Sequence, residues 1–272
     1  MGAEASGLTP MLVFVHIPKT AGTTLHKVIS HQYRRMDILI RHDSDGPVSE
    51  TLAGRSGDLP EVVMGHYSVG LHRHVPGVRY ITCLREPVSR LVSHYHYAHG
   101  FPGHYLHEAI HRDKLDLGAY VCSGLAGELS NGMTRMLAGL ENVEQPVIGQ
   151  AELEQAKENL ADYFDAVLFN DSFDEDLLLL ASRMGWSTPY YLRRKVGSYP
   201  ASAGKLDAGT RKLIEERNEI DLQLYQWAKD RFQGLAAAEP DLVTRTAAFR
   251  SRNRGIGKVI FLARELRRRL ED

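Results

Sequence analysis

Residues 14–29 read FVHIPKTAGTTLHKVI, and this stretch has the pattern of a buried strand, a tight loop and the start of a helix. Residues 11–17 are mostly apolar and have the length of a strand. Pro18 ends the run, and Gly22 lies in the turn that follows. A strand that leads through a short loop into a helix is the building unit of α/β folds, so the stretch predicts that fold class.

The loop of this stretch carries a lysine beside the expected helix start. Backbone N–H groups, the positive end of a helix dipole and Lys19 would converge there, an arrangement that suits a phosphate or sulfate group. A Walker A loop requires its lysine directly after the second glycine, whereas Lys19 precedes Gly22 by three positions. The loop is therefore not a Walker A loop, and a solvated Lys19 in an ordinary turn is the alternative interpretation.

Composition is that of one large globular domain. The chain has 272 residues, of which 43% are hydrophobic and 25% are charged, and it shows no internal repeats. We expect residues 1–10 to be an N-terminal tail and residues 11–235 to form one α/β domain with a central parallel sheet flanked by helices. Residues 236–272 are expected to form a basic C-terminal tail that contains an amphipathic helix.

Several features of the sequence predict a cytoplasmic location. The N-terminus has no basic start before its apolar run, and that run is too short to span a bilayer. Cys83 and Cys122 are the only cysteines, which fits reducing conditions better than a disulfide scaffold. The net charge of the whole chain is −1, but its C-terminal end is basic: residues 245–272 contain nine Lys or Arg and three acidic residues.

A second strand-to-helix junction carries further polar residues. Residues 61–64 read as a strand that ends at Gly65 and His66, and residues 78–84 read as another strand that runs into Arg85. The carboxyl ends of parallel strands form the edge of the sheet where ligands bind. We therefore expect Arg85 to pair with a phosphate there, together with the hydroxyl of Ser93 on the following helix.

Two separated motifs and the segment between them resemble a known family. Residues 16–24 read HIPKTAGTT, residues 84–97 read LREPVSRLVSHYHY, and residues 65–87 read GHYSVGLHRHVPGVRYITCLREP. This pattern resembles the sulfotransferases, in the branch related to heparan sulfate 2-O-sulfotransferase, over about residues 11–232. The resemblance implies a P-loop-like three-layer fold. It also implies 3′-phosphoadenosine 5′-phosphosulfate (PAPS) as the donor and adenosine 3′,5′-bisphosphate (PAP) as the product, without a metal.

The resemblance also implies roles for particular residues. Lys19 would stabilise the charge that develops during transfer, and His66 would be the general base, because imidazole titrates near neutrality. The implied nucleotide-binding residues are Lys19, Thr20, Ala21, Gly22, Thr23, Thr24, Arg85 and Ser93, with Arg194 and Lys195 from a loop that could close over the nucleotide.

The acceptor side is less defined by the sequence. We expect a hydroxyl of a carbohydrate, a glycolipid or a small molecule, and no nucleic acid. The candidate acceptor residues are His16, His94, Asn131 and Arg135. Six histidines fall in residues 94–111, where a zinc site is the alternative to an acceptor-site lining or a plain surface. We expect no metal there, because no Cys, Asp or Glu apart from Glu108 completes a ligand set.

Two other functions remain open. A nucleotide kinase or another phosphoryl transferase would require magnesium and would prefer ATP to PAP. The other is a noncatalytic nucleotide-binding, membrane-associated module, for which the presence of Lys19, His66 and Arg85 together would be a coincidence. The C-terminal helix could contact a membrane, a second copy of the chain or its own domain.

The remaining segments predict elements that support the fold. Residues 150–164 and 206–232 read as helices, and residues 166–170 read as a buried strand. Ser172 and Glu175 have the spacing of a capping box at the start of another helix.

Overall fold

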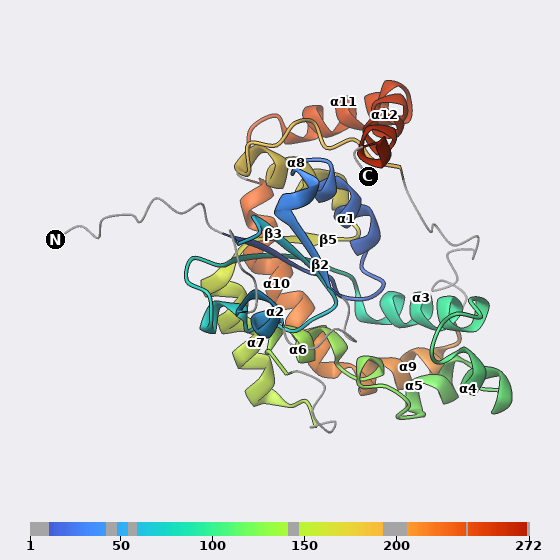
Figure 1. Cartoon of the computed structure of the whole chain (residues 1–272). Helices are drawn as coiled ribbons and strands as arrows, with labels where there is room; N and C mark the ends of the chain where they lie inside the picture. The colour runs from blue at the N-terminus through green and yellow to red at the C-terminus, as the bar shows by residue number, and fades with distance from the viewer. Residues whose placement is uncertain are drawn as a thin grey trace.

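The fold is seen in a computed structural model, which describes residues 11–41, 48–53, 59–140, 147–192, 206–237 and 239–270 (Figure 1). Its centre is a five-stranded sheet in the order β2-β3-β1-β4-β5, and all four strand pairs are parallel. The strands are β1 (Leu12–Val15), β2 (Ile38–Arg41), β3 (Val62–Gly65), β4 (Arg79–Leu84) and β5 (Phe164–Phe169). The prediction of an α/β fold with a central parallel sheet flanked by helices is confirmed.

Alternating side chains of the strands build a core on each face of the sheet. In β1, Leu12 and Phe14 belong to one core, whereas Val13 and Val15 belong to the other. The first face is covered by α1 (Gly22–Ser30) and α8 (Phe173–Arg183), and α11 (Leu242–Arg254) and α12 (Ile256–Leu270) pack outside these two helices. The second is covered by α6 (Gly132–Leu137), α7 (Gln150–Tyr163) and α10 (Glu219–Ala237).

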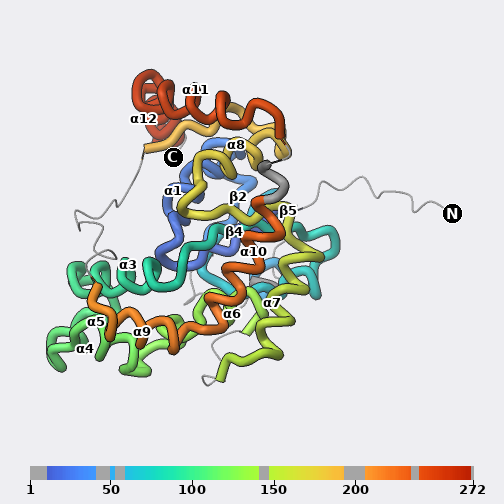
Figure 2. Tube along the Cα trace, turned by 180° about the vertical axis from the view of Figure 1, so that it is seen from behind, coloured from blue at the N-terminus to red at the C-terminus, as the bar shows by residue number. Residues whose placement is uncertain are grey.

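A third apolar cluster lies beside the sheet and holds a group of helices together. It joins α3 (Pro87–Gly100), α4 (His107–Arg112), α5 (Leu117–Cys122) and α9 (Ala208–Arg217). Figure 2 shows this group at the opposite end of the molecule from α11 and α12. The remaining elements are short: α2 (Val48–Ala53), η1 (Arg35–Asp37), η3 (Leu71–Arg73) and η4 (Gly127–Leu129).

The single helix expected over residues 206–232 is wrong, because the chain forms two helices there. The first, α9, ends at Arg217, and α10 begins at Glu219. Between them, the Asn218 side chain donates to the carbonyl oxygens of Leu129 at 3.3 Å and Ile214 at 3.1 Å. These contacts fix the break, and they depend on a segment that is remote in the sequence.

The expected capping box at the start of α8 is also wrong. Ser172 is the N-cap residue, but its side chain caps no backbone N–H group. Its hydroxyl donates instead to Asp176 at 2.7 Å, and Glu175 pairs with Arg250 of α11 at 3.0 Å. Both side chains are therefore used in other contacts.

Candidate active site

The loop between β1 and α1 has an unusual backbone that internal hydrogen bonds hold in place. Lys19 and Ala21 have φ angles of 70° and 78°, in the left-handed region that residues other than glycine rarely adopt. Thr20 donates its hydroxyl to the carbonyl of Ile17 at 2.9 Å, and the Cys83 thiol donates to the carbonyl of Thr20 at 2.7 Å. Such strain is retained where the surroundings enforce it, and left-handed turns occur in backbone concavities that bind anions.

The start of α1 supplies the other backbone groups of the loop. The N–H groups of Thr24 and Leu25 donate to the carbonyl of Ala21 at 3.0 and 3.3 Å. The first N–H groups of a helix have no partner within the helix, so those of Gly22 and Thr23 lie at its positive end. Thr23 is half-buried and Thr24 is buried. The predicted 5′-phosphate residues thus form one continuous turn.

Arg85 brings the second junction into contact with this loop. It directly follows β4, and its Nη1 donates to the carbonyl of Lys19 at 3.2 Å. Burial lowers the pKa of Arg85, although a guanidinium remains charged at neutral pH. A charged, half-buried guanidinium beside the loop is suited to an anionic ligand.

The face of α3 that carries Ser93 lies next to the same loop. Ser93 and Tyr97 are one helical turn apart and therefore share a face. The Lys19 ammonium lies 4.0 Å from the centre of the Tyr97 ring, within the range of a cation–π contact. Tyr97 was missed by the sequence analysis, although its spacing from Ser93 was a usable signal.

His66 directly follows β3 and contacts His16, which precedes the Lys19 loop. Val15 and Gly65 are paired in the parallel register, so His16 and His66 follow neighbouring strand ends. The His66 Nδ1 lies 2.6 Å from the carbonyl oxygen of His16, and the two rings stack 4.2 Å apart. Since a carbonyl can only accept, Nδ1 carries the proton in the neutral imidazole and Nε2 carries the lone pair. In this tautomer, Nε2 is the nitrogen that can accept a proton as a general base.

Gly22 is required for the packing of these rings. A Cβ atom at Gly22 would lie 1.9 Å from the His16 ring, closer than atoms can approach. Its lack of a side chain allows His16 to lie against the start of α1 while it stacks on His66. His16, predicted as an acceptor residue, is therefore placed beside the predicted base.

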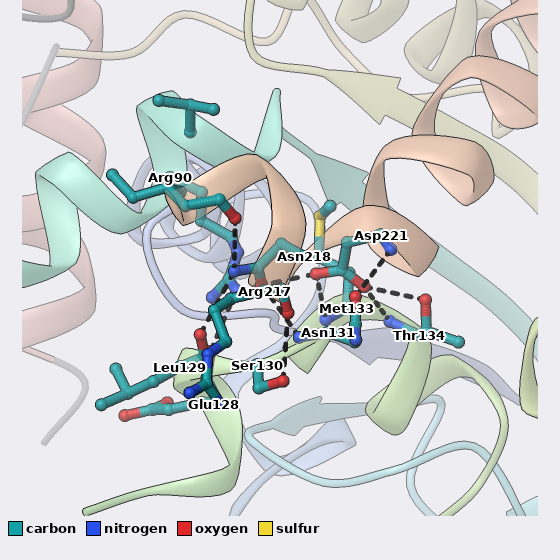
Figure 3. Close-up of polar contacts among 12 residues, drawn as sticks. Arg90, Glu128, Leu129, Ser130, Asn131, Met133, Thr134, Arg217, Asn218 and Asp221 are labelled. Carbon is teal, nitrogen blue, oxygen red and sulfur yellow. Dashed lines mark hydrogen bonds and ion pairs between the residues drawn. The ribbon is translucent and has the colours of Figure 1, made fainter. Parts of the chain in front are cut away.

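Asn131 lies in a buried contact between α6 and α10 (Figure 3). Its side-chain oxygen accepts from the backbone N–H of Asp221 at 3.0 Å, and its own N–H donates to Asn218 at 2.9 Å. The hydroxyl of Thr134 donates to Asp221 at 2.8 Å. Because the Asn131 side chain bonds within the fold, the structure gives it a structural role, and its acceptor role stays a prediction.

Two arginines lie beside this contact between α6 and α10. Arg90 is fully buried, donates to the carbonyl of Glu128 at 2.9 Å and lies 3.6 Å from Asp221. Arg135 is half-buried, and the pKa of its guanidinium is lowered by burial. A Cβ atom at Gly127 would lie 3.1 Å from the Arg135 Nε, so that side chain packs against η4.

His94 is buried in a hydrogen-bonded group that the sequence did not reveal. Its Nδ1 lies 2.7 Å from the Tyr120 hydroxyl and its Nε2 lies 2.8 Å from Glu128. Tyr105 also donates to Glu128, at 2.6 Å. Burial raises the pKa of Glu128, but the hydrogen bonds and charges of His94, Tyr105 and Arg90 outweigh burial and lower it to about 2.

His94, His104 and Glu128 form a set that could hold a metal ion. Their ligand atoms all lie within 4.8 Å of one another, and two His with one Glu is a set that catalytic zinc uses. The positive charges of Arg90 and Lys19 act on Glu128 and His104, respectively, and they oppose a cation. We therefore interpret the set as a network built on the His94–Glu128 pair, with the His104 ring packed edge to face against His94 at 5.4 Å. The absence of a metal requirement stays a prediction.

This network reaches the loop through aromatic contacts. The His104 ring meets Tyr97 edge to face at 5.4 Å, and Tyr97 lies under the Lys19 ammonium. The structure therefore brings together Lys19, Arg85, His16 and His66, with Tyr97 and His104 beside them. Ser93 lies one helical turn from Tyr97 on α3. Arg194 and Lys195 lie outside the described residues.

No protein-family model matches this chain, and a comparison with curated proteins finds no similar sequence. Among the helices that the structure describes, none is long and apolar enough to cross a membrane.

Proposed function

We propose that the chain is a PAPS-dependent sulfotransferase that transfers the sulfuryl group to a hydroxyl of a carbohydrate, a glycolipid or a small molecule. The observation that carries the proposal is the meeting of three residues at neighbouring strand ends. Arg85 contacts the Lys19 loop at 3.2 Å, and His66 contacts the residue that opens this loop at 2.6 Å. A loop suited to an anion and a histidine whose Nε2 carries the lone pair are thus adjacent, which supports the proposal.

Each of these residues has a defined role in the proposed reaction. Lys19 and the N–H groups at the start of α1 hold the 5′ end of the donor, and Arg85 with Ser93 holds its 3′-phosphate. His66 Nε2 takes the proton of the acceptor hydroxyl as the new S–O bond forms and the bond from sulfur to the phosphate oxygen breaks. Lys19 stabilises the negative charge that remains on PAP.

The nucleotide preference separates this proposal from a kinase. We expect calorimetry to show tighter binding of PAP than of ATP, with no change on adding magnesium or a chelator. Arg85→Ala is expected to weaken PAP binding more than ATP binding, because ATP lacks the 3′-phosphate. The exposed Arg112→Ala is a matched control on α4. A preference for ATP with magnesium would instead support a phosphoryl transferase.

Transfer itself separates an enzyme from a noncatalytic module. With labelled PAPS and a panel of sugars, glycolipids and small alcohols, we expect transfer to at least one acceptor. Tight PAP binding without transfer to any acceptor would favour the noncatalytic module.

A cytoplasmic site of action is also part of the proposal, and the free thiols of Cys83 and Cys122 fit the reducing conditions there.

A further inference from the structure

The last helix, α12, exposes a stripe of large apolar side chains. Ile256, Val259, Leu262, Leu266 and Leu270 are 62%, 66%, 56%, 59% and 79% exposed. We call these five residues the apolar stripe. Single exposed leucines are common on protein surfaces, but five on one face of one helix mark an interaction surface.

The opposite face of α12 fixes the helix to the domain. Phe261 is buried and meets the His31 ring at 4.7 Å. Glu265 pairs with Lys27 at 3.1 Å and with His31 at 2.8 Å. Arg268 donates to the carbonyl of Tyr33 at 3.0 Å. These contacts leave the stripe no freedom to turn inward, so it remains directed away from the domain.

Helix geometry places the two faces on opposite sides. At about 100° per residue, Val259 in the stripe and the buried Phe261 lie about 160° apart. The same spacing places Lys258 and Arg269 along one margin of the stripe and Arg267 along the other. All three basic residues are exposed. The stripe is therefore bordered by positive charge on both sides.

The acidic residues of this region do not balance that charge. Among the described residues of α11 and α12, Glu265 is the one acid, and it is turned toward α1 in the pairs with Lys27 and His31. A second copy of the chain that paired stripe to stripe would bring the same basic margins together, because a two-fold interface repeats each patch. An anionic lipid surface has the opposite charge and an apolar interior.

We propose that α12 docks the protein on an anionic phospholipid surface, with the apolar stripe inserted at the level of the head groups and the basic margins against lipid phosphates. An interfacial helix combines these two features. The docking site lies away from the candidate active site, because α12 contacts Lys27 and His31 at the C-terminal end of α1. The Lys19 loop lies at the other end of this nine-residue helix.

Vesicle flotation of the full-length protein tests the proposal. We expect the protein to float with vesicles that contain phosphatidylglycerol, to float less at high salt and to remain unbound with phosphatidylcholine alone. The double variant Leu262→Ser, Leu266→Ser should lose binding at least about tenfold, because two apolar side chains no longer insert. Val147→Ser removes an even more exposed apolar side chain elsewhere, one that is 91% exposed, and should bind as the wild type does.

Controls distinguish docking from folding and from self-association. The double variant should keep the wild-type melting temperature and PAP affinity, because the altered side chains are exposed and distant from the loop. Equal flotation of the double variant and the wild type would overturn the proposal, as would equal binding to both vesicle types. A wild-type dimer in light scattering that the double variant loses, without lipid binding, would assign the stripe to a second copy.

Discussion

The chemistry of His66 depends on one backbone contact at the residue scale. The carbonyl of His16 holds His66 Nδ1 at 2.6 Å and so directs the lone pair to Nε2. The ring stack at 4.2 Å limits how the imidazole can rotate. The sequence indicated that His66 follows a strand and placed His16 within the expected strand of residues 11–17. The structure ends β1 at Val15, and the strand order that makes His16 and His66 neighbours emerged only with the fold.

Replacing His66 tests its proposed role as the general base. We expect His66→Ala to lower the rate of sulfuryl transfer by about 10²- to 10⁴-fold, the usual contribution of a positioned base. PAP affinity should change little, because Lys19 and Arg85 remain in place. Labelled transfer and calorimetry measure the two quantities separately.

His111→Ala is the matched control, because His111 is an exposed histidine whose ring contacts His99 and His107. It should keep wild-type transfer and wild-type PAP affinity. If His66→Ala turned over at the wild-type rate, His66 would not be the base.

At the scale of elements, one buried carboxylate joins three parts of the chain. Asp221 of α10 accepts from the backbone N–H groups of Met133 at 3.0 Å and Thr134 at 2.7 Å, at the start of α6. It also lies 3.6 Å from the guanidinium of Arg90 on α3. Asp221 therefore caps the start of α6 and balances the charge of Arg90 on α3 (Figure 3).

Removing this carboxylate should destabilise the fold strongly. Asp221→Ala would leave buried N–H groups and the Arg90 charge without compensation, a loss that typically costs about 3–5 kcal/mol. Urea unfolding of Asp221→Ala and wild type measures the difference. Asp230→Ala is the control on the same helix, since Asp230 is exposed and accepts a hydrogen bond from the side chain of Gln226 at 2.8 Å. Equal losses in the two variants would contradict the structural role of Asp221.

The elements also show what the sequence could predict. The strands were found because their apolar runs are local, and the Lys19 loop was found because its residues are consecutive. The break at Asn218 was missed because the contacts that fix it come from Leu129 and Asn131, which are distant in sequence. Glu128 was missed for the same reason, since nothing near it in sequence indicates its pairing with His94. Contacts between remote segments leave no periodic pattern.

At the scale of the whole molecule, two carboxyl groups give the stability opposite dependences on pH. The pKa of Glu128 is lowered from 4.5 to about 2, so Glu128 contributes stability above pH 4.5 and loses it as the pH falls toward 2. Burial raises the pKa of Asp176 from 3.8 to about 6. Asp176 therefore lowers the free energy of unfolding as the pH rises from 3.8 through about 6, whereas Glu128 lowers it as the pH falls from 4.5 toward 2. Both contributions thus change in the acid range.

A variant that lacks one of the two groups separates these contributions. Glu128→Gln keeps the size and an acceptor oxygen but cannot titrate, so its unfolding free energy should lack the decrease that Glu128 causes. The free energy of unfolding of the wild type minus that of the variant should therefore decrease by about 3 kcal/mol as the pH falls from 5 to 2. Urea titrations across this range measure it, and the Asp176 contribution cancels because both proteins contain it. A constant difference across the range would show that the His94 pair does not hold Glu128 ionised.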